Sequence, residues 1–94
     1  MNPVSASMFY YVYILRSTKT GQWYTGFTDD LRKRFNEHNN NLSRYTKGRG
    51  PFELIYYEAY KHKTDARSRE QQLKSGPGKH YIRERLKRFL ALTG

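Results

Sequence analysis

The sequence predicts an α/β (α+β) sandwich in which helices flank a three-stranded antiparallel sheet, with the elements in the order β-β-α-β-α-α. Two observations support this prediction. Three short runs are rich in β-branched and aromatic residues, which favour strands. Between and after these runs, apolar residues recur at intervals of three and four, the spacing of one face of a helix. A chain of 94 residues is long enough for one domain with one modest core.

The first two strands are predicted at residues 9–16 (FYYVYILR) and 23–28 (WYTGFT). The sequence between them, STKTGQ, has the composition of a turn, and its short length predicts an antiparallel hairpin. A third strand is predicted at residues 52–60 (FELIYYEAY). We expect residues 1–8 to be a flexible lead-in and residues 9–92 to form the single domain.

One helix is predicted before the third strand in the sequence, and another after it. Thr28 or Asp29 can cap the first of them. Its inward positions are predicted to be Leu31, Phe35, His38 and Leu42. Thr64 can cap the second, which ends at the Ser-Gly-Pro-Gly run of residues 75–78. Its inward positions are predicted to be Ala66, Glu70 and Leu73.

A third helix is predicted from about residue 79 to residue 92. Its inward positions would be Ile82, Leu86, Phe89 and Leu90. Its outward positions would be Arg83, Arg85, Lys87 and Arg88. This last helix therefore has an apolar face for the core and a strongly basic face for solvent or a partner.

The composition excludes some chemistries and favours one kind of partner. There are no cysteines, so disulfides, zinc-thiolate sites and thiol nucleophiles are excluded. Eighteen Lys and Arg against eight Asp and Glu give a net charge of +10. Such a balance favours a polyanion, because each phosphate that is neutralised releases counterions. The alternative is a basic surface without a partner. A membrane surface is disfavoured, because the cations are spread along the chain.

We expect the protein to be cytoplasmic. No apolar run approaches the 18 residues or so of a membrane span, and residues 1–7 lack the charged and apolar regions of a secretory signal. The lack of cysteine fits a reducing compartment.

Glu70 is the most informative single residue, because it is a carboxylate on a stripe predicted to face the core. A buried carboxylate is costly unless a cation accompanies it, and that cation can be a metal ion or a neighbouring basic side chain. Mg²⁺ (or Mn²⁺) is commonly held by a single carboxylate, with water and phosphate oxygens completing its coordination. The sequence leaves both alternatives open.

Arg34 and His38 lie one turn apart on the first predicted helix. Arg34 is placed at the margin of the apolar stripe, where a guanidinium could hold a phosphate through two hydrogen bonds. His38 falls on the stripe itself and could assist proton transfer. Each also has an ordinary structural interpretation, Arg34 as a solvated cation and His38 as a hydrogen-bonded residue at the edge of the core.

Tyr13 and Tyr24 lie on the first two predicted strands, where tyrosine commonly serves packing alone. Considered together with Arg34, His38 and Glu70, the two tyrosines could also be catalytic residues. A nearby cation could lower the pKa of a phenol enough for it to take a proton from water. Gly26, two residues after Tyr24, would lie on the same strand face and leave room for a close neighbour or for the substrate backbone.

Several further cations are candidates for contact with a nucleic-acid backbone. Arg44, Lys47 and Arg49 lie in a polar loop and are interleaved with Tyr45, which could stack on a base. Lys33, on the first predicted helix, is the fourth candidate. A solvated loop explains this composition equally well.

These residues resemble the GIY-YIG nuclease superfamily. Tyr11-Val12-Tyr13 stands at the position of the first motif and Tyr24-Thr25-Gly26 at that of the second. Arg34 follows ten positions after Tyr24, as the family's arginine does, and residues 28–39 (TDDLRKRFNEHN) are similar to its first helix. Residues 50–58 (GPFELIYYE) and then Arg69-Glu70 are similar to the small single-domain members. The resemblance covers residues 9–90.

The resemblance implies a ββαβαα fold and one divalent metal ion on Glu70. It implies that Tyr13 and Tyr24 bind or activate water, that Arg34 holds the scissile phosphate, and that His38 assists the tyrosine. Members of the superfamily cut DNA, and the larger ones often gain specificity from appended domains. We therefore expect a nuclease that selects its substrate by shape, or one to which a protein partner supplies specificity.

The sequence departs from the family pattern at three points. Tyr11 replaces the first glycine, and Thr25 replaces an apolar residue. Many members also have an asparagine after the metal-binding glutamate, whereas this chain has none after Asn41. The leading hypothesis is a metal-dependent DNA endonuclease. The alternatives are a non-catalytic nucleic-acid-binding module with the same fold and, less favoured, a protein-interaction domain.

Overall fold

The computed structural model describes residues 8–44 and 46–93. Most of the predicted lead-in, residues 1–8, and the predicted stacking residue Tyr45 lie outside the described residues. The described elements are three strands and four helices: β1 (Tyr10–Ser17), β2 (Trp23–Thr28), α2 (Leu31–Asn39), β3 (Phe52–Tyr60), α3 (Lys63–Lys74), α4 (Gly76–Arg85) and α5 (Lys87–Thr93). The predicted fold class is confirmed, with one more helix than predicted.

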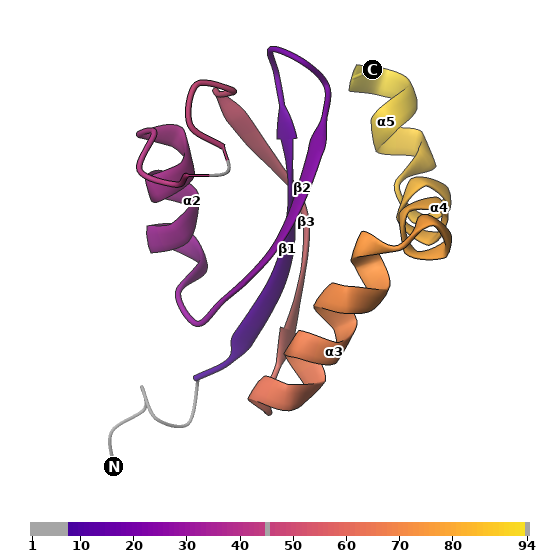
Figure 1. Cartoon of the computed structure of the whole chain (residues 1–94). Helices are drawn as coiled ribbons and strands as arrows, with labels where there is room; N and C mark the ends of the chain where they lie inside the picture. Colours follow the sequence, from indigo (N-terminus) through magenta and orange to yellow (C-terminus); the bar gives the residue numbers. More distant parts are fainter. Residues whose placement is uncertain (1–7, 45, 94) are drawn as a thin grey trace.

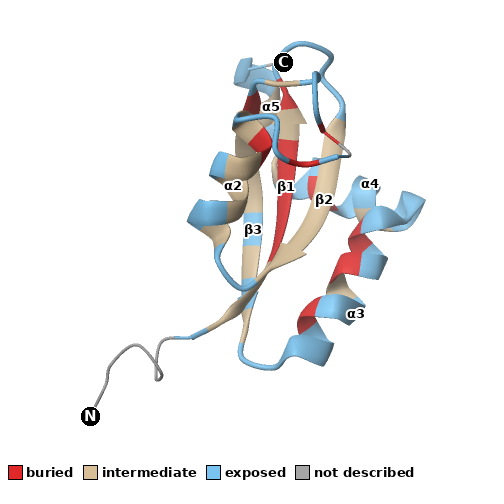
Figure 2. Ribbon diagram, turned by 60° about the vertical axis from the view of Figure 1, so that its left-hand side comes forward, coloured by how far each residue is buried: buried red, intermediate tan, exposed pale blue. Residues whose placement is uncertain are grey.

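The sheet has the strand order β2-β1-β3, and both pairings are antiparallel. Strand β1 is therefore the central strand, which explains its continuous apolar sequence: Val12, Tyr13, Ile14 and Leu15 are all buried (Figure 2). The register places Tyr13 opposite Gly26 of β2. Directly paired residues share a face of the sheet, so this pairing decides which side chain lies over Gly26.

Helices cover both faces of the sheet (Figure 1). Helix α2 lies against one face, and α3, α4 and α5 lie on the other. Because successive side chains of a strand point to opposite faces, β1 contributes to two clusters. Val12 and Ile14 pack with residues of α3 and α4, whereas Tyr13 and Leu15 pack with Phe52 and with residues of α2.

Two predicted details of the first helix are wrong. Its cap is Asp30, whose carboxylate accepts a hydrogen bond from the Lys33 amide at 3.1 Å, rather than Thr28 or Asp29. Thr28 instead accepts a hydrogen bond from the Asp30 amide. The helix ends at Asn39, so Leu42 is not on its stripe and is 71% exposed. A local cap ends this helix, because Asn41 adopts a left-handed conformation (φ 60°) and the Leu42 amide donates a hydrogen bond to the Glu37 carbonyl at 2.9 Å.

The boundaries of the later helices also differ from the prediction. His62 caps α3, through its ring Nδ1, in place of Thr64. The predicted stop at residues 75–78 is also a start, because Ser75 caps α4, which begins at Gly76. The single third helix is divided at Leu86 into α4 and α5. Among the described helices, none is both long enough and apolar enough to span a membrane.

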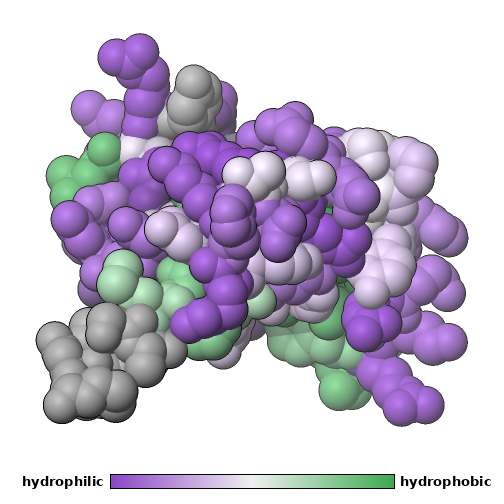
Figure 3. Space-filling model, turned by 90° about the horizontal axis from the view of Figure 1, so that it is seen from below, coloured by the Kyte–Doolittle hydropathy of each residue, from purple (hydrophilic) through white to green (hydrophobic). Residues whose placement is uncertain are grey.

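The surface of the molecule seen from below is mainly hydrophilic (Figure 3). Hydrophobic side chains appear there only in small, separate groups. This pattern agrees with the high charge of the chain and leaves the two packed faces of the sheet as its main apolar regions.

Candidate active site

A cleft of about 550 Å³ lies beside β2 and brings together five residues singled out in the sequence. They are Tyr13, Tyr24, Arg34, His38 and Glu70. They come from β1, β2, α2 and α3, so elements on both faces of the sheet contribute to one site. The free edge of β2 is where the two faces meet, and this explains how α2 and α3 can line the same cleft.

Gly26 allows Tyr13 to reach this edge. A Cβ atom at position 26 would lie 2.3 Å from the Tyr13 Oη and 2.4 Å from its Cζ. The phenol therefore lies directly over the backbone of β2, in space that any side chain at this position would fill. The predicted close neighbour of Gly26 is thus Tyr13 itself.

We expect Gly26→Ala to lower any catalytic activity of the cleft by about 100-fold, because misplacing a reacting group by about 1 Å can have an effect of that size. The new methyl group must push the Tyr13 ring aside and break its contact with His38. Activity and urea unfolding would both be measured. In a Tyr13→Ala background the same change should cost almost no stability, because the ring is gone; equal costs in both backgrounds would contradict this explanation.

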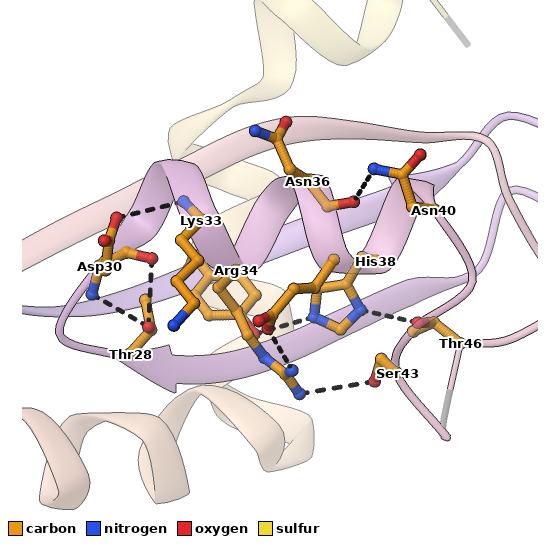
Figure 4. A network of polar contacts seen from close by, with 11 residues as sticks. Thr28, Asp30, Lys33, Arg34, Asn36, His38, Asn40, Ser43 and Thr46 are labelled. Carbon is orange, nitrogen blue, oxygen red and sulfur yellow. Dashed lines mark hydrogen bonds and ion pairs between the residues drawn. The ribbon is translucent and has the colours of Figure 1, made fainter.

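Tyr13, His38 and Thr46 form a chain of hydrogen bonds, of which Figure 4 labels His38 and Thr46. The Tyr13 Oη lies 3.0 Å from His38 Nε2, and His38 Nδ1 lies 2.7 Å from the Thr46 Oγ1. His38 is only 5% exposed, and both of its ring nitrogens are in contact with a partner. The imidazole is thereby fixed in one orientation against the phenol.

Arg34 lies beside this chain. Its Nη1 is 3.0 Å from the Glu37 Oε1, and its Nη2 is 3.4 Å from the Ser43 Oγ (Figure 4). The guanidinium also interacts with the Tyr13 phenol. It is about one-third exposed, so a ligand in the cleft can reach it. The weak contact with Ser43 is one that a phosphate oxygen could replace.

Burial favours the neutral forms of both the phenol and the imidazole. It raises the pKa of Tyr13, and Arg34 offsets this only in part. Burial, with the positive charge of Arg34, lowers the pKa of His38 to about 4. At neutral pH the pair is therefore a phenol and an uncharged imidazole, and one imidazole nitrogen has a free lone pair.

Tyr24 has an unusual environment. Its hydroxyl is buried and has no hydrogen-bond partner among the described residues. Its ring meets that of Phe52 edge to face, with 5.5 Å between the centroids. Buried hydroxyls nearly always have a partner, so this one indicates a water molecule or a ligand in the cleft.

Glu70 is only 6% exposed and lies between two cations of its own helix. Its Oε1 is 3.5 Å from the Arg67 Nη1, and its Oε2 is 3.1 Å from the Lys74 Nζ. Of the two alternatives that the sequence left open, the neighbouring basic side chain is thus present. Both cations were missed in the sequence, although their positions three residues before and four after Glu70 would have indicated them.

The donor set at Glu70 fits one hard divalent cation. No group of three or more His, Asp or Glu side chains comes together in the described part of the chain. Among the described lining residues of the cleft, Glu70 is the one carboxylate, so a cation here would have one protein carboxylate and take its other ligands from water and phosphate, as Mg²⁺ tolerates. It would also compete with Arg67 and Lys74 for the carboxylate oxygens.

The four cations proposed from the sequence as contacts to a nucleic-acid backbone differ in their position relative to the cleft. Arg49 lines the cleft. Lys33, Arg44 and Lys47 are exposed and are not among the described residues that line it. Three cations that the sequence reasoning did not select do line it: Arg67, Lys74 and Lys79. The positive charge around the cleft thus comes largely from α3 and α4.

Glu58 of β3 holds α3 in position. Its carboxylate accepts hydrogen bonds from the Arg69 Nε at 2.8 Å and the Arg69 Nη2 at 3.0 Å. The hydroxyls of Tyr56 and Tyr60 donate to the same carboxylate. Since Arg69 directly precedes Glu70, this bidentate pair fixes the part of α3 that carries the buried carboxylate.

This network makes the stability of the protein depend on pH. Burial alone would raise the pKa of Glu58, but the hydrogen bonds from Arg69, Tyr56 and Tyr60 lower it from 4.5 to about 2. The stabilisation is therefore complete above about pH 4.5 and is lost as the pH falls toward 2. We expect Glu58→Gln to remove about 1–2 kcal/mol of acid-dependent stability, less than the full linkage value because the pair is partly solvated. Parallel stability–pH curves for the two proteins, measured by urea unfolding, would contradict this.

Comparison with known proteins shows the family. The model of the GIY-YIG catalytic domain matches residues 9–89, nearly the whole chain. The protein therefore belongs to the GIY-YIG family and carries a nuclease-type domain.

The relatives that it resembles are UPF0213 proteins. It is 48% identical to the UPF0213 protein of Clostridium perfringens over 65 residues, which are 68% of this chain and 69% of that one. It is 38% identical to the UPF0213 protein of Halalkalibacterium halodurans over 88 residues, 93% of this chain and 87% of that one. The solution NMR structure of the UPF0213 protein from Bacillus halodurans matches 93% of this chain and 87% of that one, with 36% identity and a TM-score of 0.46.

Proposed function

We propose that this protein is a divalent-metal-dependent endonuclease that hydrolyses phosphodiester bonds in DNA. One observation carries the proposal: two tyrosines, an arginine, a histidine and a buried carboxylate line the same cleft, and the hydroxyl of Tyr24 has no partner among the described residues. Membership of a nuclease-type family gives this arrangement its chemical interpretation.

Arg34 is proposed to hold the scissile phosphate. Its side chain is anchored by Glu37 at 3.0 Å, and its contact with Ser43, at 3.4 Å, is weak enough to be exchanged for a phosphate oxygen. As the phosphorus becomes five-coordinate, negative charge grows on the equatorial oxygens, and a fixed guanidinium stabilises it.

Tyr13 is the better candidate of the two tyrosines for taking the proton of the attacking water. Its hydroxyl is held by a hydrogen bond to the neutral His38, whose Nε2 lies 3.0 Å away. With the ring hydrogen on Nδ1, His38 donates to Thr46 and accepts from the phenol. The oxygen of water bonds to phosphorus as the bond from phosphorus to the leaving oxygen breaks. The water proton enters the Tyr13–His38 chain, and the leaving oxygen takes a proton from solvent. Tyr24 would hold the water through its otherwise unpaired hydroxyl.

Glu70 would hold the divalent ion, Mg²⁺ or Mn²⁺. A bound ion would supply positive charge to stabilise the charge that develops on the leaving oxygen. Tyr13 and Glu70 are near enough for the charge of the carboxylate to raise the pKa of the phenol. A cation on Glu70 would remove that effect and favour loss of the phenolic proton.

Selection of DNA by shape, rather than by sequence, is part of the proposal. The cations that line the cleft are suited to phosphates, which carry no sequence information. Their spatial arrangement can still distinguish a branched or bent backbone from a straight one. A protein partner could add further specificity.

A second candidate function is a non-catalytic nucleic-acid-binding module, and the ion pairs of Glu70 favour it. A carboxylate already neutralised by Arg67 and Lys74 has less need of a metal ion. For this function we expect nucleic-acid binding whose affinity falls steeply with salt concentration. We expect no metal-dependent cleavage product.

A cleavage panel tests the two candidates. Single-stranded, duplex, flapped and branched DNA, with single-stranded RNA, would be incubated with Mg²⁺, with Mn²⁺ and with chelator. Products that depend on metal are expected for at least one DNA, and the preferred substrate would define the shape that is recognised. Binding without products under every metal condition would favour the non-catalytic module. Cleavage in chelator would contradict the role given to Glu70.

A further inference from the structure

The positively charged wall of the cleft extends beyond the residues that the proposed mechanism uses. Lys79, in the first part of α4, lines the cleft, and Arg83 follows one helical turn later on the same face. Trp23, the first residue of β2, also lines the cleft. The guanidinium of Arg83 lies over the Trp23 ring, 5.3 Å from its centroid. These three residues, Trp23, Lys79 and Arg83, are called the α4 patch below.

The α4 patch lies on the other face of the sheet from the Tyr13–His38 chain. Trp23 packs with the cluster formed by α3 and α4, whereas its neighbour Tyr24 packs with the cluster that includes residues of α2. Both side chains nevertheless line the same cleft. A strand that entered beside Arg34 could therefore cross the edge of β2 and leave over α4.

The charge of this region suits a polyanion. In the described part of the cleft wall, Glu70 is the one carboxylate, and it is paired with Arg67 and Lys74. Lys79 and Arg83 thus add positive charge that Glu70 does not neutralise. Four residues of helix separate their Cα atoms by about 6 Å along the axis, which allows each cation its own phosphate.

Trp23 pre-organises the Arg83 side chain for binding a phosphate. Stacking of the guanidinium on the indole restricts a long side chain that would otherwise move freely in solvent. The N–H donors around the rim of the guanidinium stay available for a phosphate. Less conformational entropy is then lost on binding than for an unsupported arginine.

We propose that the α4 patch is a docking site for the phosphodiester backbone of the DNA strand that flanks the cleavage position. This proposal rests on the proposed function, because it takes DNA as the ligand. The patch binds phosphates outside the reacting centre, so it sets affinity and the minimum substrate length and takes no part in the chemistry.

The test compares two double variants with the same loss of charge. Lys79→Gln/Arg83→Gln changes the patch, and Arg85→Gln/Arg88→Gln removes two exposed cations that are not among the described lining residues of the cleft. Binding of a single-stranded DNA of about 20 nucleotides would be measured across a salt series. We expect the first variant to lower the slope of log Kd against log salt by about 1 for each cation, and the control to leave it nearly unchanged.

The fluorescence of Trp23 gives a second readout that does not depend on activity. The sequence contains one tryptophan, so a change in emission on adding the same DNA reports the patch directly. We expect this change in the wild type and in the control variant, and its loss in the Lys79→Gln/Arg83→Gln variant.

The outcomes separate failure of this proposal from failure of the proposed function. Equal salt slopes for the two double variants, with an unchanged Trp23 signal, would overturn the docking site while metal-dependent cleavage by the wild type still stood. A wild type that neither binds nor cuts DNA would overturn both. Loss of slope and signal in the patch variant alone would support the docking site.

Discussion

Glu70→Ala is expected to abolish cleavage while leaving the binding of DNA intact. The substitution removes the carboxylate proposed to hold the metal ion and leaves the phosphate contacts of the cleft in place. It also releases Arg67 and Lys74, which are paired with Glu70 at 3.5 Å and 3.1 Å. Two cations set free in a cleft that binds a polyanion should hold affinity constant or raise it.

Cleavage and binding must be measured on the same protein for this expectation to be decisive. Turnover would be followed on the preferred substrate of the panel, and affinity by fluorescence anisotropy in chelator. Glu84→Ala is the matched control, because Glu84 is an exposed carboxylate that is not among the described lining residues. A Glu70→Ala protein that cuts at the wild-type rate would rule out the mechanism. Joint loss of binding and of the folded circular-dichroism spectrum would show that the carboxylate serves the fold instead.

Gly78→Ala is expected to destabilise the protein by about 3 kcal/mol or more, against the usual trend for helices. Replacing glycine by alanine inside a helix normally stabilises it by about 1 kcal/mol. Here the added Cβ would lie 2.0 Å from the Gln72 carbonyl oxygen and 2.7 Å from the Leu73 Cα. Both atoms belong to backbone, so no side-chain rotation relieves the clash, and α4 must move away from the end of α3.

The matched control lies two residues earlier. A Cβ at Gly76 would have nothing within 4 Å, although Gly76 belongs to the same first turn of α4. Gly76→Ala is therefore expected to change the free energy of unfolding by less than about 0.5 kcal/mol. Urea unfolding of the two variants beside the wild type measures both effects. Similar values would show that the corner between α3 and α4 has more freedom than its geometry implies.

The wall of the cleft depends on this corner. Lys74 precedes it and Lys79 follows it, and both line the cleft. A displaced α4 would also disturb the α4 patch, because Arg83 would lose its position over Trp23. Gly78 thus connects the stability of the domain with its proposed contact to DNA.

Much of the fold follows from local patterns. The three strands lie within one residue of their predicted ranges, and the central strand carries the longest unbroken apolar run. Ala66, Glu70 and Leu73 are all buried on α3, as their spacing predicted. These features depend on the period of a strand or a helix, which neighbouring residues in the sequence are enough to define.

The errors in helix bounds occur at local caps, where the chain ends or begins a helix regardless of the apolar period. Leu42 continues the apolar period of α2, yet the helix has ended three residues before it. The glycine and proline run at residues 75–78 is predicted to end one helix, with the next beginning at about residue 79, whereas α4 already begins at Gly76. A composition that breaks one helix can begin another, and here the Ser75 hydroxyl begins α4 by accepting a hydrogen bond from the Gly78 amide at 3.1 Å.

The sequence by itself determined the three strands, the order of the elements and the inward position of Glu70, because these depend on residues close together in the chain. Only the tertiary structure decided that Tyr13, from the α2 face of the sheet, lines the same cleft as Glu70, from the opposite face, at the edge of β2. It also decided that Thr46 holds His38 and that Lys79 joins the cleft. Such contacts depend on how whole elements pack against each other, and the periodicity of a single element carries no information about that packing.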